Sequence, residues 1–173
     1  MTMNKKALLV IDMQNDYLWA KRKHVFTYDT AELVARINSC IHEYSAEGCD
    51  IIYIAQVFPD IFTNRLFIGF SIKGTEGAEF YDKLDIVSEL CFEKNLPDTF
   101  TAKKFRKHFE SRGYSEIYLC GIDECGCVGA TAKGAVKAGA SVYLIEKCTG
   151  CRYNGKKRSA MHKKLESLGV SYI

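Results

Sequence analysis

The sequence predicts an α/β fold in which a parallel sheet has helices on both of its faces. Six short apolar runs alternate with longer segments whose apolar residues recur at helical spacing, a pattern typical of βα units. Some of these runs are apolar at nearly every position, as expected for strands covered on both faces. The chain has 173 residues, of which 47% are hydrophobic, so it can bury a sizeable core. We expect one domain over residues 1–173.

The first half of the chain is expected to contain two strands separated by a long helix. Residues 7–12 form the first apolar run. The helix should begin near Asp29 or Thr30, which can cap its N-terminus, and end near Gly48. Residues 50–58 form the second run and are almost continuously apolar. The stretch 59–85 is irregular and long for a simple connection, so it either holds a small helix or lines a site.

The second half of the chain is expected to alternate strands and helices without interruption. The four remaining strands are predicted at residues 89–94, 116–122, 141–146 and 170–173. Helices are predicted at about 101–111 and at about 156–168, and a further helix that bears Cys127 at its start, near Val128, should end near Gly139. No repeat, low-complexity segment or second domain is evident.

Three chemically active side chains follow three of the predicted strands. Asp12 ends the first run, Lys94 ends the third, and Cys127 comes after the fourth, where a helix begins. Ligands bind to open parallel sheets at the carboxyl ends of the strands, where the strand order reverses. A helix N-terminus presents free N–H groups and favours a thiolate. The pattern indicates an enzyme site with Cys127 as its nucleophile.

Several segments of the chain resemble the isochorismatase-like cysteine hydrolases. Residues 8–17, Leu-Leu-Val-Ile-Asp-Met-Gln-Asn-Asp-Tyr, look like the opening signature of that family. Residues 121–131, Gly-Ile-Asp-Glu-Cys-Gly-Cys-Val-Gly-Ala-Thr, resemble its nucleophile motif. Lys94 with Phe100 matches the spacing after the family lysine, and residues 74–79 resemble the loop before the third strand. The similarity runs through nearly the whole chain in the same order.

The resemblance implies a Rossmann-like, three-layer α/β/α sandwich with a six-stranded parallel sheet. It also implies hydrolysis of a small amide or carbamoyl compound through a thioester, with Asp12 as general base, Lys94 as electrostatic partner and Cys127 as nucleophile. The oxyanion hole implied by the resemblance consists of the backbone N–H groups of Asp123 and Cys127, with a cis peptide between Ile122 and Asp123. A homo-oligomer is implied as well.

The residues themselves support this chemistry but leave alternatives open. A free thiol is only a few per cent ionised at neutral pH, so it needs a base such as Asp12 or a nearby cation such as Lys94. Alone, Asp12 could instead be a turn or capping residue, Lys94 a solvated strand end, and Cys127 a small buried helix residue. Cys125 is a second candidate nucleophile, although the position directly before Val128 in the motif favours Cys127.

The eight cysteines suggest a second class of function. Cys148 and Cys151 form a CxxC motif after the fifth strand, on the same expected edge as Cys125 and Cys127. These four thiols could bind zinc or exchange redox equivalents, although a single CxxC is most often incidental. A catalytically idle family member that serves as a binding module is a third alternative.

Neither a metal nor another cofactor is expected. Nicotinamidase-type members of the family carry a metal site with an aspartate and histidines just after the second strand. Here residues 57–64 contain one aspartate and no histidine, and the four histidines lie elsewhere. Siderophore-pathway isochorismatases, which cleave a vinyl ether, lack the cysteine, so Cys127 favours cleavage of a C–N bond.

Aromatic residues near the predicted edge suggest a pocket for a small planar amide. Each of them alone is more often a core residue than a ligand contact. The substrate itself is not identified by the sequence. The expected pocket walls are Tyr17, Trp19, Gln56, Phe58, Phe67, Phe100 and Tyr153.

Composition excludes several other classes of protein. The net charge is only +3 and the basic residues are scattered, so we expect no nucleic-acid partner. No apolar segment approaches the roughly 20 residues needed to span a bilayer, so no membrane partner is expected. The N-terminus lacks the features of a signal peptide, which predicts a cytoplasmic protein with reduced thiols.

Overall fold

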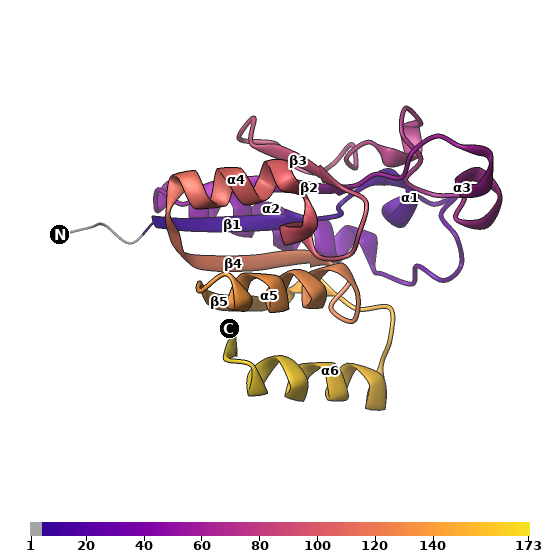
Figure 1. The fold of residues 1–173 in the computed structure, drawn as a ribbon. Coiled ribbons are helices and arrows are strands. Elements are labelled where there is room, and N and C mark those ends of the chain that lie inside the picture. The colour runs from indigo at the N-terminus through magenta and orange to yellow at the C-terminus, as the bar shows by residue number, and fades with distance from the viewer. Residues whose placement is uncertain (1–4) are drawn as a thin grey trace.

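The computed structural model describes residues 5–173 and contains one six-stranded sheet (Figure 1). The strand order is β3-β2-β1-β4-β5-β6, and every neighbouring pair is parallel. The predicted fold class is confirmed. Residues 1–4, on which the expected lack of a signal peptide partly rests, lie outside the described residues. The strands are β1 (Lys5–Ile11), β2 (Asp50–Gln56), β3 (Cys91–Lys94), β4 (Tyr114–Ile122), β5 (Ser141–Gly150) and β6 (Val170–Tyr172).

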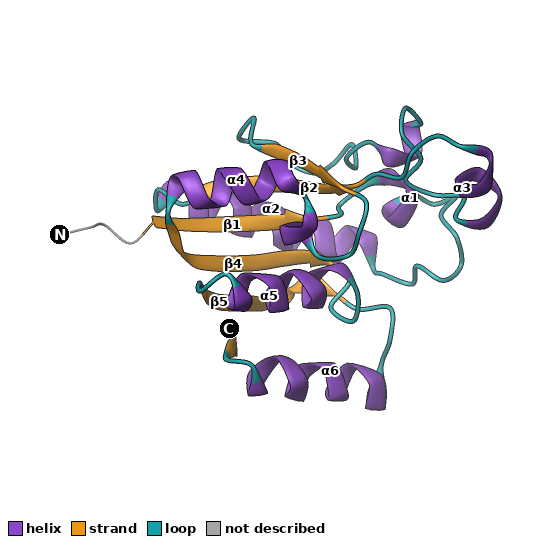
Figure 2. Ribbon diagram, in the orientation of Figure 1, coloured by secondary structure: helices purple, strands orange, loops and turns teal. Residues whose placement is uncertain are grey.

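Helices cover both faces of the sheet and give three layers (Figure 2). α2 (Thr30–Ala46) packs on one face, and α4 (Lys103–Arg112), α5 (Cys127–Lys137) and α6 (Gly155–Ser167) contribute to the core on the other. The shorter elements α1 (Asn15–Leu18), α3 (Phe62–Phe67), η1 (Glu76–Ala78) and η2 (Thr99–Thr101) lie in the connections.

The alternation of side chains along β1 explains why its sequence is apolar throughout. Leu8 and Val10 belong to the core beneath α2, whereas Leu9 and Ile11 belong to the opposite core. Successive residues of a strand point to opposite faces, so a central strand with helices on both sides needs apolar residues at every position.

Several predicted strand boundaries differ from the observed ones by one or two residues, and the differences at the ends of β2 and β5 affect the site. β2 ends at Gln56 rather than at residue 58, because Phe58 turns away to pair with Ser71 and Lys73 in the long connection. β5 continues to Gly150 rather than ending at residue 146, because an irregularity in its pairing with β4 lets residues 149–150 rejoin the sheet. The stretch 59–85 holds the small helices α3 and η1. Among the described residues, no helix is long and apolar enough to cross a membrane.

The sheet reverses its strand order between β1 and β4, and this reversal determines where a ligand site can form. The two strands approach so closely there that a Cβ atom on Gly121 would lie 2.2 Å from the Ile11 carbonyl oxygen, so only glycine fits. Asp12, directly after β1, has a φ of +55°, a left-handed conformation that aspartate tolerates better than most residues. Local backbone geometry thus directs Asp12 to the carboxyl edge.

Candidate active site

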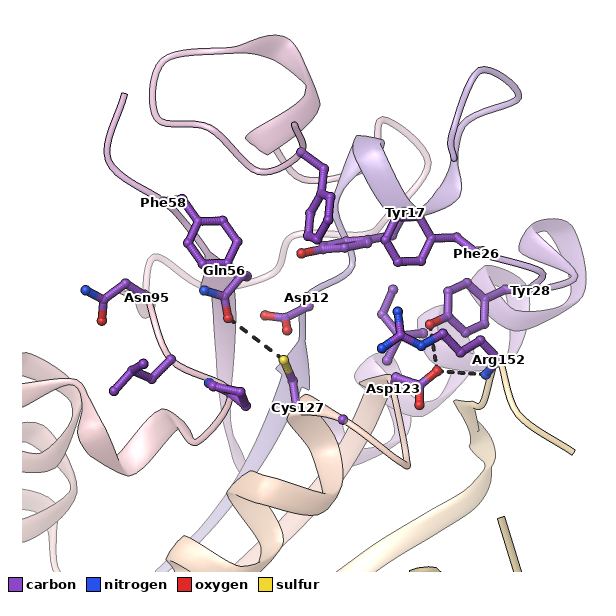
Figure 3. A pocket seen from close by; sticks show the side chains of 15 residues that line it. Asp12, Tyr17, Phe26, Tyr28, Gln56, Phe58, Asn95, Asp123, Cys127 and Arg152 are labelled. Atoms are coloured by element: carbon purple, nitrogen blue, oxygen red, sulfur yellow. Dashed lines mark hydrogen bonds between the residues drawn. The ribbon is translucent and has the colours of Figure 1, made fainter. Parts of the chain in front are cut away.

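The three residues predicted as catalytic lie together at the carboxyl edge of the sheet (Figure 3). The Lys94 Nζ donates a hydrogen bond of 2.9 Å to the Asp12 Oδ2, and both side chains are at most 3% exposed. Cys127 is the first residue of α5 and is half-buried. Asp12, Lys94 and Cys127 therefore come from three different segments, as the positions of the predicted strands implied.

Gln56 is a fourth member of this group. Its Oε1 accepts a 2.7 Å hydrogen bond from Lys94 Nζ and lies 3.9 Å from the Cys127 Sγ. Gln14, from the opening motif, holds the Gln56 backbone from both sides, accepting its N–H and donating to its carbonyl at 2.9 Å each. Sequence analysis predicted Gln56 only as a pocket wall; in the structure it also fixes the position of the lysine.

The charges of the site act on the thiol and on the ammonium in defined directions. Burial alone would lower the pKa of Lys94, but Asp12 and Cys127 raise it above its ordinary value. Burial and the Asp12 carboxylate raise the pKa of Cys127, and Lys94 offsets only part of that effect. Burial and Asp12 therefore act against the preference for a thiolate that is expected at a helix N-terminus.

The turn between β4 and α5 carries the backbone groups predicted for an oxyanion hole. The peptide bond between Ile122 and Asp123 is cis. The Asp123 carbonyl accepts hydrogen bonds from the N–H groups of Gly126 and Val128, at 2.9 and 3.0 Å, which closes the turn. Cys127 begins α5, where the first N–H groups have no acceptor within the helix. Both predicted N–H donors thus belong to one tight turn at the cavity.

A cavity of about 330 Å³ opens above Cys127. This volume lies at the lower end of the range for small-molecule sites. Of the predicted pocket residues, Tyr17, Gln56 and Phe58 line it. Its lining residues are Asp12, Tyr17, Phe26, Tyr28, Gln56, Phe58, Phe70, Asn95, Leu96, Pro97, Ile122, Asp123, Gly126, Cys127 and Arg152.

Arg152 lies on the side of the cavity opposite Gln56, and its guanidinium points toward the middle (Figure 3). The Arg152 backbone N–H donates a 2.7 Å hydrogen bond to the Asp123 Oδ2, which also accepts from the Tyr28 hydroxyl at 2.7 Å. The Arg152 Nε is buried and has no hydrogen-bond partner in the described part of the chain. Sequence analysis missed this residue, because the fifth strand was predicted to end at residue 146, whereas β5 continues to Gly150.

Comparison with known proteins agrees with the geometry. The sequence model of the isochorismatase domain family matches residues 6–172. The chain belongs to the isochorismatase family. An uncharacterised isochorismatase family protein of Bacillus subtilis is 24% identical over 141 residues, which cover 81% of this chain and 74% of that protein.

Two solved structures share the isochorismatase fold of this chain. The pyrazinamidase of Pyrococcus horikoshii in complex with zinc is 22% identical, with a TM-score of 0.83 and 98% of both chains covered. The N-carbamoylsarcosine amidase of Thermoplasma acidophilum is 21% identical, with a TM-score of 0.79 and coverage of 97% of this chain and 95% of that one. The predicted family and fold are confirmed, and membership supports the expectation of a hydrolase acting on C–N bonds.

Four predicted pocket residues do not line the cavity. Phe100 is buried against Phe105 and Phe109, in the core on the α4 side of the sheet. Trp19 packs under Lys21 at a separate surface hollow, because α1 ends just before it. Phe67, on the short helix α3, is 79% exposed. Tyr153, one residue beyond Arg152, packs against Lys157 instead.

The four cysteines of the alternative redox or metal function do not converge. Cys148 is buried in the core beneath α2, where its thiol lies 3.4 Å from the Arg36 carbonyl, because β5 continues past residue 146 and turns that side chain inward. Cys127 faces Gln56. Cys125 and Cys151 remain as a pair, with their Sγ atoms 3.6 Å apart.

The residues after β2 do not fit the metal site of nicotinamidase-type relatives. Asp60 is exposed and forms an ion pair with Arg65, with 2.7 Å between its Oδ2 and the Arg65 Nη2. In residues 5–173, the one group of three metal-ligating side chains is Asp123, Cys125 and Cys151, at the end of a different strand. The described side chains after β2 therefore lack the donor set of such a metal site.

Proposed function

We propose that this member of the isochorismatase family is a cysteine amidohydrolase that cleaves the C–N bond of a small amide or carbamoyl compound carrying a carboxylate. One arrangement carries the proposal: the Cys127 thiol faces the buried Asp12–Lys94 pair at the floor of a cavity into which the unpaired Arg152 guanidinium points. The Cys127 thiol with the Asp12–Lys94 pair supports the reaction, and the Arg152 guanidinium supports the substrate class.

Asp12 is suited to the role of general base. Its Oδ2 is held by Lys94, whereas its Oδ1 is buried without a hydrogen-bond partner in the described residues. Because the pKa of Cys127 is raised, the thiol keeps its proton until a substrate arrives. Asp12 then takes that proton as the sulfur attacks the carbonyl carbon, and Lys94 compensates the negative charge that remains.

The remaining steps follow from the same groups. The tetrahedral oxyanion accepts hydrogen bonds from the N–H groups of Asp123 and Cys127, each worth about 2.7–4 kcal/mol in such sites. Asp12 returns the proton to the leaving nitrogen as the C–N bond breaks, which leaves a thioester on Cys127. Water, deprotonated by Asp12, attacks the thioester carbon, and the proton returns to the sulfur as the acyl product leaves.

The unpaired Arg152 supports an anionic substrate. A buried N–H without a partner costs free energy that a ligand can recover. In the described chain the Arg152 guanidinium carbon lies 5.1 Å from the Tyr153 ring centre and 5.8 Å from the Phe26 ring centre, so its neighbours are aromatic rings. A carboxylate can accept two parallel hydrogen bonds from a guanidinium. The aromatic lining suits the apolar part of a small substrate. N-carbamoyl amino acids combine these features, and the similarity to an N-carbamoylsarcosine amidase supports this choice.

A screen for ammonia release tests the proposal. Each N-carbamoyl amino acid is assayed beside the matched N-carbamoyl amine that lacks the carboxylate, with nicotinamide and biuret as unmatched amides. We expect turnover of an N-carbamoyl acid with a kcat/KM roughly 10- to 100-fold above that of its neutral match, the difference one charged hydrogen-bond pair supplies.

The Cys127→Ser variant is the control for the screen, because ammonia release by a contaminating amidase would persist in preparations of this variant. Turnover of neutral amides with no preference for the acids would overturn the assigned substrate class but leave the amidohydrolase intact. Ammonia release that persists undiminished in Cys127→Ser would overturn the amidohydrolase assignment itself.

A further inference from the structure

Cys125 and Cys151 form a thiol pair beside the cavity that the proposed reaction does not use. Their Sγ atoms are 3.6 Å apart, and both side chains are partly exposed. Cys125 lies in the turn between β4 and α5, and Cys151 follows β5, 26 residues later. The two thiols therefore belong to two different loops of the site and are in direct contact.

The two loops are already joined next to this pair by the Asp123 carboxylate. Its Oδ1 accepts the Cys125 N–H at 2.9 Å and lies 3.9 Å from the Cys151 Sγ, and its Oδ2 accepts the Arg152 N–H at 2.7 Å. The Glu124 N–H adds a 3.0 Å hydrogen bond to the Gly150 carbonyl. A disulfide requires an S–S distance of about 2.05 Å, so the two Sγ atoms, now 3.6 Å apart, must approach each other by roughly 1.5 Å.

A disulfide fits the pair better than a metal does. Asp123 is the third donor in the group, but both of its oxygens already accept hydrogen bonds. A structural zinc site takes four protein ligands, and the group found in residues 5–173 has three. We propose that Cys125 and Cys151 are a site of reversible disulfide formation that links the nucleophile turn to the loop carrying Arg152.

The reaction is a thiol–disulfide exchange with a small aliphatic disulfide. Burial raises the pKa of Cys151, but hydrogen bonds from the Tyr153 N–H and from Cys125 lower it in part. Burial and Cys151 raise the pKa of Cys125 to about 12 with no such offset, so we assign Cys151 as the first attacking thiol. The Cys151 thiolate attacks the small disulfide and releases one small thiolate. Cys125, after losing its proton, attacks the Cys151 sulfur and releases the second. Two protein thiols are oxidised and one small disulfide is reduced to two thiols.

Oxidised glutathione is the probe for this reaction. The full-length protein is incubated with it under native conditions, quenched in acid, alkylated in denaturant and mapped by mass spectrometry of its peptides. We expect one cross-linked peptide pair that contains Cys125 and Cys151, loss of two alkylatable thiols out of eight, and full reversal by dithiothreitol.

Matched variants decide the assignment. Cys125→Ser and Cys151→Ser should each abolish the cross-link, whereas the exposed Cys91→Ser should retain it. Near-UV circular dichroism establishes that each variant is folded. A cross-link that involves Cys127 or Cys148, a glutathione adduct that never resolves, or no oxidation would overturn the proposal. So would a protein that keeps both thiols reduced with one zinc ion bound. Because the readout is mass, it does not depend on the amidohydrolase activity.

Discussion

The two sides of the cavity differ in how their charged groups are paired. On the nucleophile side, the Lys94 ammonium donates to Asp12 and Gln56, and the buried atoms without a hydrogen-bond partner are the Asp12 Oδ1 and the Gln56 Nε2. On the opposite side, Asp123 holds Tyr28 and the Arg152 backbone, and the atom left over is a guanidinium N–H. One side is ready to accept a proton, and the other is ready to donate hydrogen bonds to an anion.

This difference indicates a division of labour between chemistry and recognition. The Asp12–Lys94 pair is internally neutral, so its geometry does not depend on the ligand. The buried Nε of Arg152 has no hydrogen-bond partner in residues 5–173, so a bound anion would supply one that the chain does not. Changes on the first side should therefore affect kcat or folding, and changes on the second should affect KM. Four experiments, from the largest expected effect to the smallest, separate the two sides.

Removal of the nucleophile should cause the largest loss. Cys127→Ser should lower kcat by roughly 10⁴-fold or more, as in other enzymes that lose the attacking atom. Binding of a carboxylate product should be nearly unchanged by isothermal calorimetry, because Arg152 is untouched. Cys91→Ser, at an exposed site, is the matched control. Loss of product binding together with turnover would show that the two sides are not separable.

Removal of Lys94 should destabilise the fold strongly. Lys94→Met leaves the Asp12 carboxylate buried without a partner, which should lower the free energy of unfolding in urea by about 3–5 kcal/mol. The double variant Asp12→Asn with Lys94→Met should recover most of that loss, because no buried charge remains. A double variant as unstable as Lys94→Met would contradict the paired-charge account.

Removal of the guanidinium should weaken binding selectively. Arg152→Met should raise KM for a carboxylate-bearing substrate by roughly 10- to 100-fold and leave kcat within a few-fold. A neutral analogue should show little change, and Arg152→Lys should recover part of the loss. If kcat fell with KM unchanged, Arg152 would belong to the chemistry of the nucleophile side.

The pH dependence of Cys127 alkylation should show the smallest and most specific effect. The raised pKa of this thiol predicts an iodoacetamide rate that is slow at neutral pH and still rising above pH 9.0, its ordinary pKa. Asp12→Asn removes a group that raises this pKa, so more thiolate forms at a given pH and labelling should accelerate by roughly 3- to 10-fold. Arg152→Met should leave the pH dependence of Cys127 labelling unchanged. A changed pH dependence in this variant would show that the two sides of the cavity are coupled electrostatically.

The fold could be predicted from the sequence because its signals are local. The apolar run of β1 and the capping aspartate of α2 need no distant information, and Asp29 does accept the Glu32 N–H. The far end of β5 could not be predicted this way. Residues 147–150 are only partly apolar, and they join the sheet through pairing with Gly121 and Ile122, which depends on the register of another strand.

In the candidate site, too, the features that depend on local sequence could be predicted, and those that depend on three-dimensional packing could not. Asp12, Lys94 and Cys127 each end or follow an apolar run, so their shared edge followed from topology alone. The fate of the aromatic residues did not, because a ring near the edge can point to either face: Phe58 lines the cavity, whereas Phe100 fills the core. The raised pKa of Cys127 also lay beyond the sequence, since it depends on how deeply Asp12 and the thiol are buried together.

The irregular pairing of β4 and β5 has a consequence for how substrate preference can evolve. Between two paired positions, the single residue Cys120 on β4 lies opposite four residues, 145–148, on β5. The number of residues in this unpaired stretch affects which residue follows the end of β5 next to Asp123, a place now held by Arg152. A residue inserted or deleted within 145–148 can therefore change which side chains follow β5 beside Asp123, and it leaves Asp12, Lys94 and Cys127, which belong to other segments, untouched. A change of length there can exchange specificities that no single substitution at the catalytic residues could reach.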